Sequence, residues 1–143
     1  MPFFLNNTKI LAKPFPNFNI LLKEIFSQSP LISDFLFFRR GRDAIIYGLN
    51  ILDVSAGSTI IVPAYMCNST VLPLIENGYK LFFLDINDDL NFDPDELREC
   101  ITKSKAKAII DVHYFGFNSN INEVVEVCRE LNVKVIEDCC HSF

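Results

Sequence analysis

Long runs of lysine or arginine are missing from this sequence. It has 13 basic against 18 acidic residues and a formal net charge of −5, and its densest basic group is Arg39-Arg40 with Arg42. A general nucleic-acid-binding surface needs a basic stripe or patch to neutralise phosphates. The composition therefore argues against nucleic acid as a partner.

Two common phosphate-binding signatures are also missing. The sequence contains neither a G-x-G-x-x-G segment nor a Walker segment. Both motifs use glycine to bring backbone N–H groups close to phosphates at the start of a helix. A dinucleotide-dependent or NTP-hydrolysing enzyme is therefore disfavoured.

The cysteines lack the spacing of a disulfide framework. Their number is odd, no C-x-x-C spacing occurs, and two of them are adjacent, a pair that does not easily close a normal bridge. This pattern indicates a reducing compartment, and we expect a cytoplasmic protein. The five are Cys67, Cys100, Cys128, Cys139 and Cys140.

No segment near the N-terminus has the apolar length of a signal peptide or a membrane span. The apolar start, Phe3-Phe4-Leu5, is soon interrupted by asparagine, lysine and proline residues. A signal-peptide core or a spanning helix needs a longer unbroken run. We therefore expect a soluble chain that makes no membrane contact.

Apolar residues are abundant. Half of the 143 residues are hydrophobic and 14 are phenylalanine, which is enough for about one domain with its own core. Residues 1–40 form an aromatic, proline-interrupted N-terminal arm with one helix expected near residues 17–27. We expect this arm to pack on another subunit or domain.

Residues 41–143 show a regular pattern that predicts an α/β domain. Helices are expected at about 42–52, 69–76 and 122–131, with another that opens at Asp93-Pro94, a good capping pair. The segments between them are apolar throughout, which is typical of a mostly parallel sheet with helices on both faces, a three-layer α/β fold. The expected strands are Ile60–Val62, Lys80–Asp85, Ala108–His113 and Lys134–Ile136.

The first candidate binding site is Gly41-Arg42-Asp43, at the start of a helix. Free N–H groups and the helix dipole bind anions there, glycine lets a ligand approach the backbone, and Arg42 adds a charge-assisted contact. The alternative is an ordinary turn at Gly41 with Asp43 as a first-turn acid.

The second candidate is the segment of residues 63–70, which follows a strand and opens a helix. Loops at that edge of a sheet carry ligands, and Tyr65 or Met66 could lie against a flat ring. The alternative is plain helix capping by Asn68 or Ser69, with Met66 in the core.

The third candidate is the segment of residues 111–116 at another strand end, which contains Asp111 and His113. A histidine beside aromatic residues is more often a hydrogen-bonded packing residue than a catalyst. Asp111 lies inside an apolar strand, where a carboxylate needs a partner. The sequence does not identify that partner.

The fourth candidate, Glu137-Asp138-Cys139-Cys140-His141, follows the last strand. An acid and an imidazole at the carboxyl end of a buried strand lie where an open α/β sheet places its ligand. With Cys67 and His113 these residues could be imagined as a zinc site, but adjacent Cys-Cys-His has poor geometry for one tetrahedral ion, so we expect no metal. The alternative is a structural acid at a strand end.

Together these segments resemble the large domain of the DegT/DnrJ/StrS-type sugar-nucleotide aminotransferases, which are fold-type I pyridoxal-phosphate enzymes. The resemblance runs from about Phe38 to Phe143 and rests on the order and spacing of its motifs. It implies the N-terminal part of a large domain. The motifs include Gly-Arg-Asp-Ala-Ile, Ile-Ile-Val-Pro-Ala-Tyr, Leu-Asn-Phe-Asp-Pro-Asp-Glu-Leu, Lys-Ala-Ile-Ile-Asp-Val-His-Tyr-Phe-Gly and Val-Ile-Glu-Asp-Cys-Cys-His-Ser-Phe.

The resemblance implies pyridoxal 5'-phosphate as the cofactor and assigns residues to it. Asp138 would pair with the pyridine nitrogen and keep it protonated. His141 would lie near the ring hydroxyl, and Gly41 with Arg42 would match the turn that binds the phosphate.

Three positions depart from the family pattern. The family often has an aromatic residue over the ring at the position of Cys67, so here Cys67 or a shifted Tyr65 would cover the ring face. Arg42 replaces a common threonine, and Asp111 replaces a common proline.

The family's Schiff-base lysine and small C-terminal domain lie beyond the Glu137-Asp138 strand, and none of the lysines here falls at a matching position. We therefore expect a truncated, inactive aminotransferase, because transamination would have no base. When complete, it would be a homodimer that moves an amino group from an amino-acid donor to a keto-sugar nucleotide. The alternative is a non-catalytic α/β interaction module or pseudo-enzyme.

Overall fold

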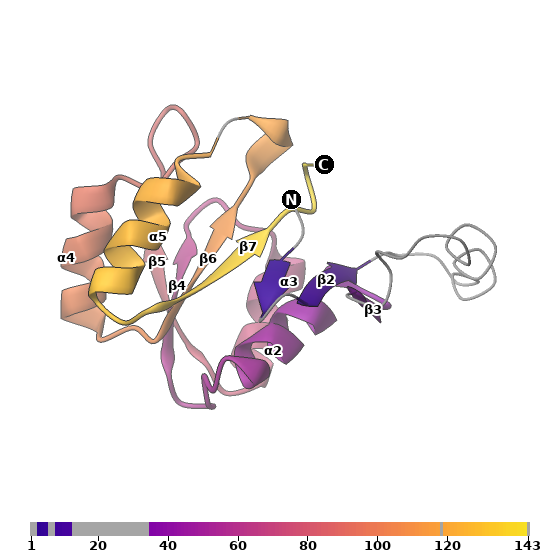
Figure 1. Ribbon diagram of the computed structural model, residues 1–143. Helices are drawn as coiled ribbons and strands as arrows, with labels where there is room; N and C mark the ends of the chain where they lie inside the picture. Colours follow the sequence, from indigo (N-terminus) through magenta and orange to yellow (C-terminus); the bar gives the residue numbers. More distant parts are fainter. Residues whose placement is uncertain (1–2, 6–7, 13–34, 118, 143) are drawn as a thin grey trace.

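A computed structural model of the protein describes residues 3–5, 8–12, 35–117 and 119–142 (Figure 1). Its centre is a four-stranded sheet in the order β5-β4-β6-β7, and all neighbouring strands are parallel. The strands are β4 (Thr59–Pro63), β5 (Lys80–Leu84), β6 (Ala108–Val112) and β7 (Lys134–Asp138).

Helices cover both faces of this sheet, so the expected three-layer α/β fold is confirmed (Figure 1). One face packs against α2 and α3, and the opposite face packs against α4 and α5. The helices are α2 (Gly41–Ile51), α3 (Asn68–Glu76), α4 (Pro94–Ser104) and α5 (Ile121–Glu130).

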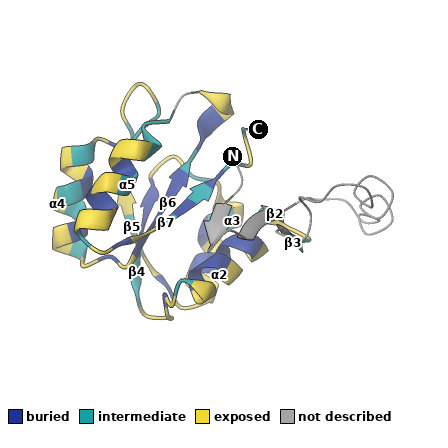
Figure 2. Cartoon of the chain, viewed as in Figure 1, coloured by how far each residue is buried: buried dark blue, intermediate teal, exposed yellow. Residues whose placement is uncertain are grey.

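The central strands are apolar throughout because both of their faces are covered. In β6, Ile109 packs with α4 and α5, whereas its neighbours Ala108 and Ile110 pack with α2 and α3. All three are fully buried, and Figure 2 shows the two central strands, β4 and β6, as largely buried. Strands covered in this way have no polar face, which explains why the sequence does not alternate.

β7 is longer than the sequence predicted. We expected the strand to end at Ile136 and the two carboxylates to follow it, but the ladder with β6 continues and pairs Asp111 with Glu137 and Val112 with Asp138. Successive side chains of a strand point to opposite faces. Glu137 and Asp138 therefore lie on different sides of the sheet, and the expected adjacent pair is in fact two separate acids.

A small second sheet precedes the domain, in the order β1-β2-β3, with β1 and β2 antiparallel and β2 and β3 parallel. β2 and β3 lie beside α2. The strands are β1 (Phe3–Leu5), β2 (Thr8–Ala12) and β3 (Phe35–Phe38). The helix expected near residues 17–27 lies outside the described residues, and the domain boundary at residue 40 stays a prediction.

None of the helices in the described part of the chain is both long and apolar enough to cross a membrane. The longest, α2 and α4, have 11 residues each. A spanning helix needs about 20 apolar residues.

The start of α4 is capped as the sequence predicted. Asp93 Oδ1 accepts hydrogen bonds from the backbone N–H groups of Asp95 and Glu96, at 2.9 and 3.0 Å, and Pro94 occupies the first turn. These bonds satisfy two of the N–H groups that a helix leaves unpaired at its start. The cap fixes where α4 begins beneath the sheet.

Replacing Asp93 by alanine is expected to lower the free energy of unfolding by about 1 kcal/mol, because both capping bonds are lost. The measurement is urea denaturation followed by circular dichroism. The exposed Asp88 in the preceding turn offers a matched control, and Asp88→Ala should change stability by less than about 0.5 kcal/mol. Equal losses in the two variants would contradict the assigned cap.

Candidate functional site

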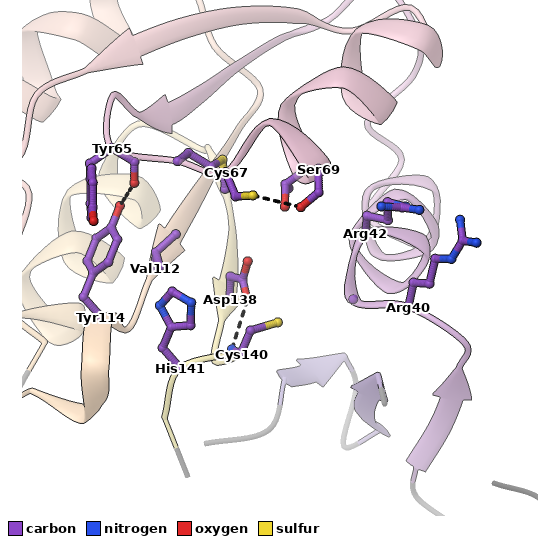
Figure 3. Close-up of a pocket in the computed structure, with 13 residues that line it drawn as sticks. Arg40, Arg42, Tyr65, Cys67, Ser69, Val112, Tyr114, Asp138, Cys140 and His141 are labelled. Atoms are coloured by element: carbon purple, nitrogen blue, oxygen red, sulfur yellow. Dashed lines mark hydrogen bonds between the residues drawn. The ribbon is translucent and has the colours of Figure 1, made fainter. Parts of the chain in front are cut away.

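A cavity of about 460 Å³ opens where the carboxyl ends of β4, β6 and β7 meet the start of α2 (Figure 3). All six residues that the sequence singled out as a cofactor site line it, although they come from three separate segments. These six are Gly41, Arg42, Tyr65, Cys67, Asp138 and His141. The other lining residues are Arg40, Met66, Ser69, Thr70, Val112, Tyr114 and Cys140.

One side of the cavity is electropositive. It is formed by the start of α2, where Arg40 is the N-cap residue and Gly41 and Arg42 begin the helix. The Arg40 carbonyl accepts from the N–H groups of Asp43 and Ala44, which fixes the first turn. The dipole of α2 and two guanidinium groups therefore favour an anion at this end.

Asp138 is fixed at the last position of β7 and faces the cavity beside Val112. The residue is only 9% exposed. Its Oδ1 accepts from the backbone N–H of Cys140 at 3.1 Å, and its carbonyl accepts from the N–H of His113 at 3.0 Å. Both the side chain and the backbone of this acid are thus held in place.

The thiol of Cys140 lies beside that carboxylate. Although much of the residue is exposed, burial of the thiol and its interaction with Asp138 raise the pKa of Cys140 to about 12. The thiol stays protonated at neutral pH, so it adds no second negative charge next to Asp138.

Tyr65 and Tyr114 form the wall opposite the arginines (Figure 3). The Tyr114 hydroxyl donates to the Tyr65 carbonyl, and the two ring centroids are 5.6 Å apart. Tyr114 is buried and Tyr65 is exposed. Burial raises the pKa of Tyr114 to about 12, so its hydroxyl remains a donor and keeps the loop after β4 in position.

His141 lies at the mouth of the cavity and is supported by an aromatic neighbour. Its ring stacks on Phe115 with a centroid distance of 5.4 Å and an interplanar angle of 8°. Phe115 has φ +52° and is largely exposed, in the short 3-10 turn η2 (Tyr114–Gly116) after β6. The turn after β6 thus orients the imidazole that follows β7.

Cys67 occupies the N-cap position of α3, and no side chain caps that helix. The alternative of capping by Asn68 or Ser69 is therefore wrong: the Ser69 hydroxyl donates to Cys67 Sγ at 3.1 Å instead. This hydrogen bond lowers the pKa of the exposed Cys67 thiol. Met66 is half-buried, so it packs on the core and also lines the cavity.

Asp111 and His113 lie outside the cavity lining. Asp111 has two partners that the sequence could not identify. Ser119 Oγ donates to Asp111 Oδ2 at 3.2 Å, and His113 Nε2 is 3.7 Å from the same oxygen. Burial raises the pKa of Asp111, and His113 opposes that shift. Cys67 and His113 do not come together, so the imagined zinc grouping of these two residues is not formed.

Among the lining residues, Arg40 lies outside the candidate segments of the sequence. Thr70, Val112 and Tyr114 lie inside those segments, but sequence reasoning does not assign them to the cofactor. Arg40 had one available signal, because it precedes the glycine of a predicted anion-binding turn. Val112 and Tyr114 could be found only from the register of β6 on β7, which places Val112 beside Asp138.

Solved structures and characterised proteins resemble this chain over most of its length. It is 34% identical over 104 residues to the 3-oxo-glucose-6-phosphate:glutamate aminotransferase of Bacillus subtilis (strain 168), a match that covers 72% of the chain and 23% of that protein. The crystal structure of NtdA from Bacillus subtilis with bound cofactor PMP has a TM-score of 0.65 at 33% identity, covering 72% and 24%.

A third likeness is to the Escherichia coli GDP-4-keto-6-deoxy-D-mannose-3-dehydratase with bound hydrated PLP. Its TM-score is 0.61 at 31% identity, and the match covers 72% of the chain and 28% of that structure. The chain thus spans about a quarter of the length of the relatives that it matches.

The parallel sheet is covered on both faces, and the cavity at its carboxyl edge lies between a helix N-terminus and a buried aspartate. This is the fold of the N-terminal part of the large domain in fold-type I pyridoxal-phosphate enzymes. The chain belongs to the DegT/DnrJ/EryC1/StrS aminotransferase family, whose model matches residues 37–143. Pyridoxal phosphate is the cofactor of that family. The sequence resemblance is confirmed.

Cys67 should be alkylated by iodoacetamide before Cys140, although both residues are exposed. Thiolate is the reactive form, and the pKa is lowered for Cys67 and raised for Cys140. Ser69→Ala should slow the alkylation of Cys67 at pH 7, because the hydrogen bond that favours thiolate is lost. Peptide mapping by mass spectrometry gives both rates.

The matched control is Asn68→Ala, which alters the neighbouring exposed residue and leaves the Ser69 hydroxyl in place. It should leave the alkylation rate of Cys67 unchanged. A Ser69→Ala protein that reacts as fast as the parent would show that this hydrogen bond does not control the thiol.

Proposed function

We propose that this chain forms the cofactor-binding part of a pyridoxal-phosphate-dependent aminotransferase that acts on keto-sugar nucleotides with an amino-acid donor. One observation carries the cofactor assignment: two arginines at a helix N-terminus and one buried carboxylate line the same cavity. These groups match the two ends of a molecule with a phosphate at one side and a basic ring nitrogen at the other.

The start of α2 would hold the phosphate. The backbone N–H groups of Gly41 and Arg42 precede the first hydrogen bonds of the helix, Gly41 adds no side-chain bulk, and Arg42 supplies a charge-assisted hydrogen bond. Arg40 extends the positive surface beyond the residues that the sequence indicated. Thr70 lines the same cavity and adds a hydroxyl donor, whereas the Ser69 hydroxyl donates to Cys67 Sγ.

Asp138 would hold a proton on the pyridine nitrogen. Its carboxylate is nine-tenths buried and oriented by the Cys140 N–H, so it favours a positively charged partner more strongly than an exposed acid would. When bound, the cofactor supplies an electron sink that stabilises negative charge on the substrate carbon. The contribution of this chain is to keep that sink protonated and aligned.

The ring itself would be flanked by Tyr65, Cys67 and His141. No aromatic side chain stands at position 67, and Tyr65 is held against Tyr114. The Cys67 thiol and the Tyr65 side chain would therefore take the place of a stacked aromatic ring. His141, stacked on Phe115, would lie beside the ring hydroxyl. No lysine is among the residues that line the cavity.

The substrate class follows from the relatives. One is a glutamate-dependent aminotransferase and another is a dehydratase of a GDP-keto-sugar. Their common feature is a keto group on an activated or phosphorylated sugar, and we assign amino transfer to this protein. The free thiols fit a cytoplasmic protein. The exposed Tyr65, Phe115 and Phe117 beside the cavity fit a second subunit of a homodimer.

The cofactor assignment is tested with pyridoxamine 5'-phosphate, which has no aldehyde to react with surface lysines. Equilibrium dialysis should show saturable binding to the chain. Asp138→Asn and Arg42→Gln should each weaken binding about tenfold or more, because a hydrogen bond to a charged group contributes about 1.5–3 kcal/mol.

Matched controls are available for both variants. Asp85→Asn changes an exposed acid that follows β5, and Arg39→Gln changes an exposed arginine next to the site. Neither residue lines the cavity, so both variants should bind as the parent does. If the parent shows no saturable binding, the non-catalytic interaction module is the better account.

The amino-transfer assignment needs a protein that carries this domain together with the remaining length of its relatives. Such a protein should release 2-oxoglutarate from glutamate in catalytic amounts only when a keto-sugar nucleotide is present, as followed by coupled absorbance. Asp138→Ala should abolish that turnover. Release of the deoxygenated sugar without amine incorporation would instead identify a dehydratase.

A further inference from the structure

A second cluster of potential ligand atoms lies on the face of the sheet opposite the cavity. Because Asp111 pairs with Glu137 in the ladder, both side chains project toward the side covered by α5, whereas Val112 and Asp138 project into the cavity. Ser119, in the segment before α5, bonds to Asp111. The cluster is therefore separate from the cofactor site, and its ligand chemistry does not depend on the proposed function.

Three side chains converge there. His113 Nε2 lies 3.0 Å from Glu137 Oε2, and the ligand atoms of His113, Glu137 and Cys139 all lie within 4.8 Å of one another. His113 is only 9% exposed, and its Nε2 is buried without a hydrogen-bond partner among the described residues. The contact with Glu137 is close but lacks hydrogen-bond geometry, so a buried nitrogen points into an acidic site unsatisfied.

The acidic groups of this cluster favour a cation. Asp111 Oδ2 is 3.7 Å from the same Nε2, so two carboxylates flank one imidazole in a largely buried position. Buried charge is unfavourable unless it is neutralised. A single proton on Nε2 can make one good hydrogen bond, whereas a cation can contact the nitrogen, the carboxylate and the thiol together.

We propose that His113, Glu137 and Cys139 bind a divalent transition-metal ion of the zinc class, with Asp111 as an outer partner. Nitrogen, carboxylate oxygen and sulfur are the ligands that Zn²⁺ accepts together, whereas Ca²⁺ and Mg²⁺ require oxygen ligands. Three protein ligands leave one tetrahedral position for water. Asp111, held by Ser119, is placed to hydrogen-bond to a group bound there.

Such an ion would fix the backbone around the cofactor acid. Glu137 and Cys139 are the immediate neighbours of Asp138, and His113 already donates its backbone N–H to the Asp138 carbonyl. Binding on one face would therefore hold the carboxylate on the other face in its position. The side chains used are different from those that line the cavity.

The test is titration of the reduced, metal-free chain with Zn²⁺ in competition with a chromophoric chelator. One ion per chain is expected. His113→Gln and Glu137→Gln should weaken binding by at least about tenfold, and Asp111→Asn by about tenfold to a hundredfold, the range found for outer partners of metal sites. The Co²⁺ form should show a thiolate-to-metal charge-transfer band that Cys139→Ser removes.

His141→Gln and Cys140→Ser are the matched controls, because they change the same residue types on the cavity side of the sheet. Both should bind Zn²⁺ as the parent does. A further measurement uses the parent chain alone and so does not depend on whether a variant folds. Bound Zn²⁺ should protect Cys139, and not Cys67, from alkylation. The proposal fails if the parent binds no stoichiometric Zn²⁺, if Zn²⁺ leaves Cys139 unprotected, or if Cys140→Ser weakens binding as much as Cys139→Ser.

Discussion

The register of β7 on β6 is the constraint on which the rest of this structure depends. The ladder pairs Val112 with Asp138 and is extended by the bond from His113 N–H to the Asp138 carbonyl. A shift by one residue would move Asp138 to the α5 side and turn Glu137 into the cavity. Main-chain pairing decides which acid faces the cavity. That pairing is secured by Ile110 and Ile136, buried between the sheet and α2.

The cavity derives its polarity from opposed backbone elements. A helix begins at one wall and a strand ends at the other, so partial positive charge from α2 faces a carboxylate at the carboxyl edge of the sheet. Side chains increase this difference in charge. Arg40 and Arg42 add positive charge at the end of the cavity near α2, and the protonated thiol of Cys140 adds no negative charge beside Asp138. The site is therefore largely preformed by the fold.

The sequence predicted the layers well because their cause is local. Apolar runs without alternation indicate strands covered on both sides, and Asp93-Pro94 marks a helix start through contacts within four residues. It failed where the cause is non-local. The extension of β7 depends on hydrogen bonds to β6, and the partner of Asp111 is Ser119, which approaches it only when the chain turns back into α5.

The candidate site shows the same division. Asp138, Gly41 and Arg42 could be predicted, because family motifs mark them in the sequence, and the structure brings them to one cavity. The role of Tyr114 could not be predicted, since it depends on a hydroxyl bond to the backbone of Tyr65, 49 residues away. The side of the sheet to which each acid of β7 points also cannot be predicted until the end of the strand is known.

His141, stacked on Phe115, and Asp138 are held in the site by different parts of the structure. The acid is held by the paired backbone of two strands, whereas the imidazole depends on an exposed turn after β6. Changes of sequence in that turn could therefore move the mouth of the cavity without disturbing its floor. The shape of the entrance is thus adjustable separately from the strand end that holds Asp138.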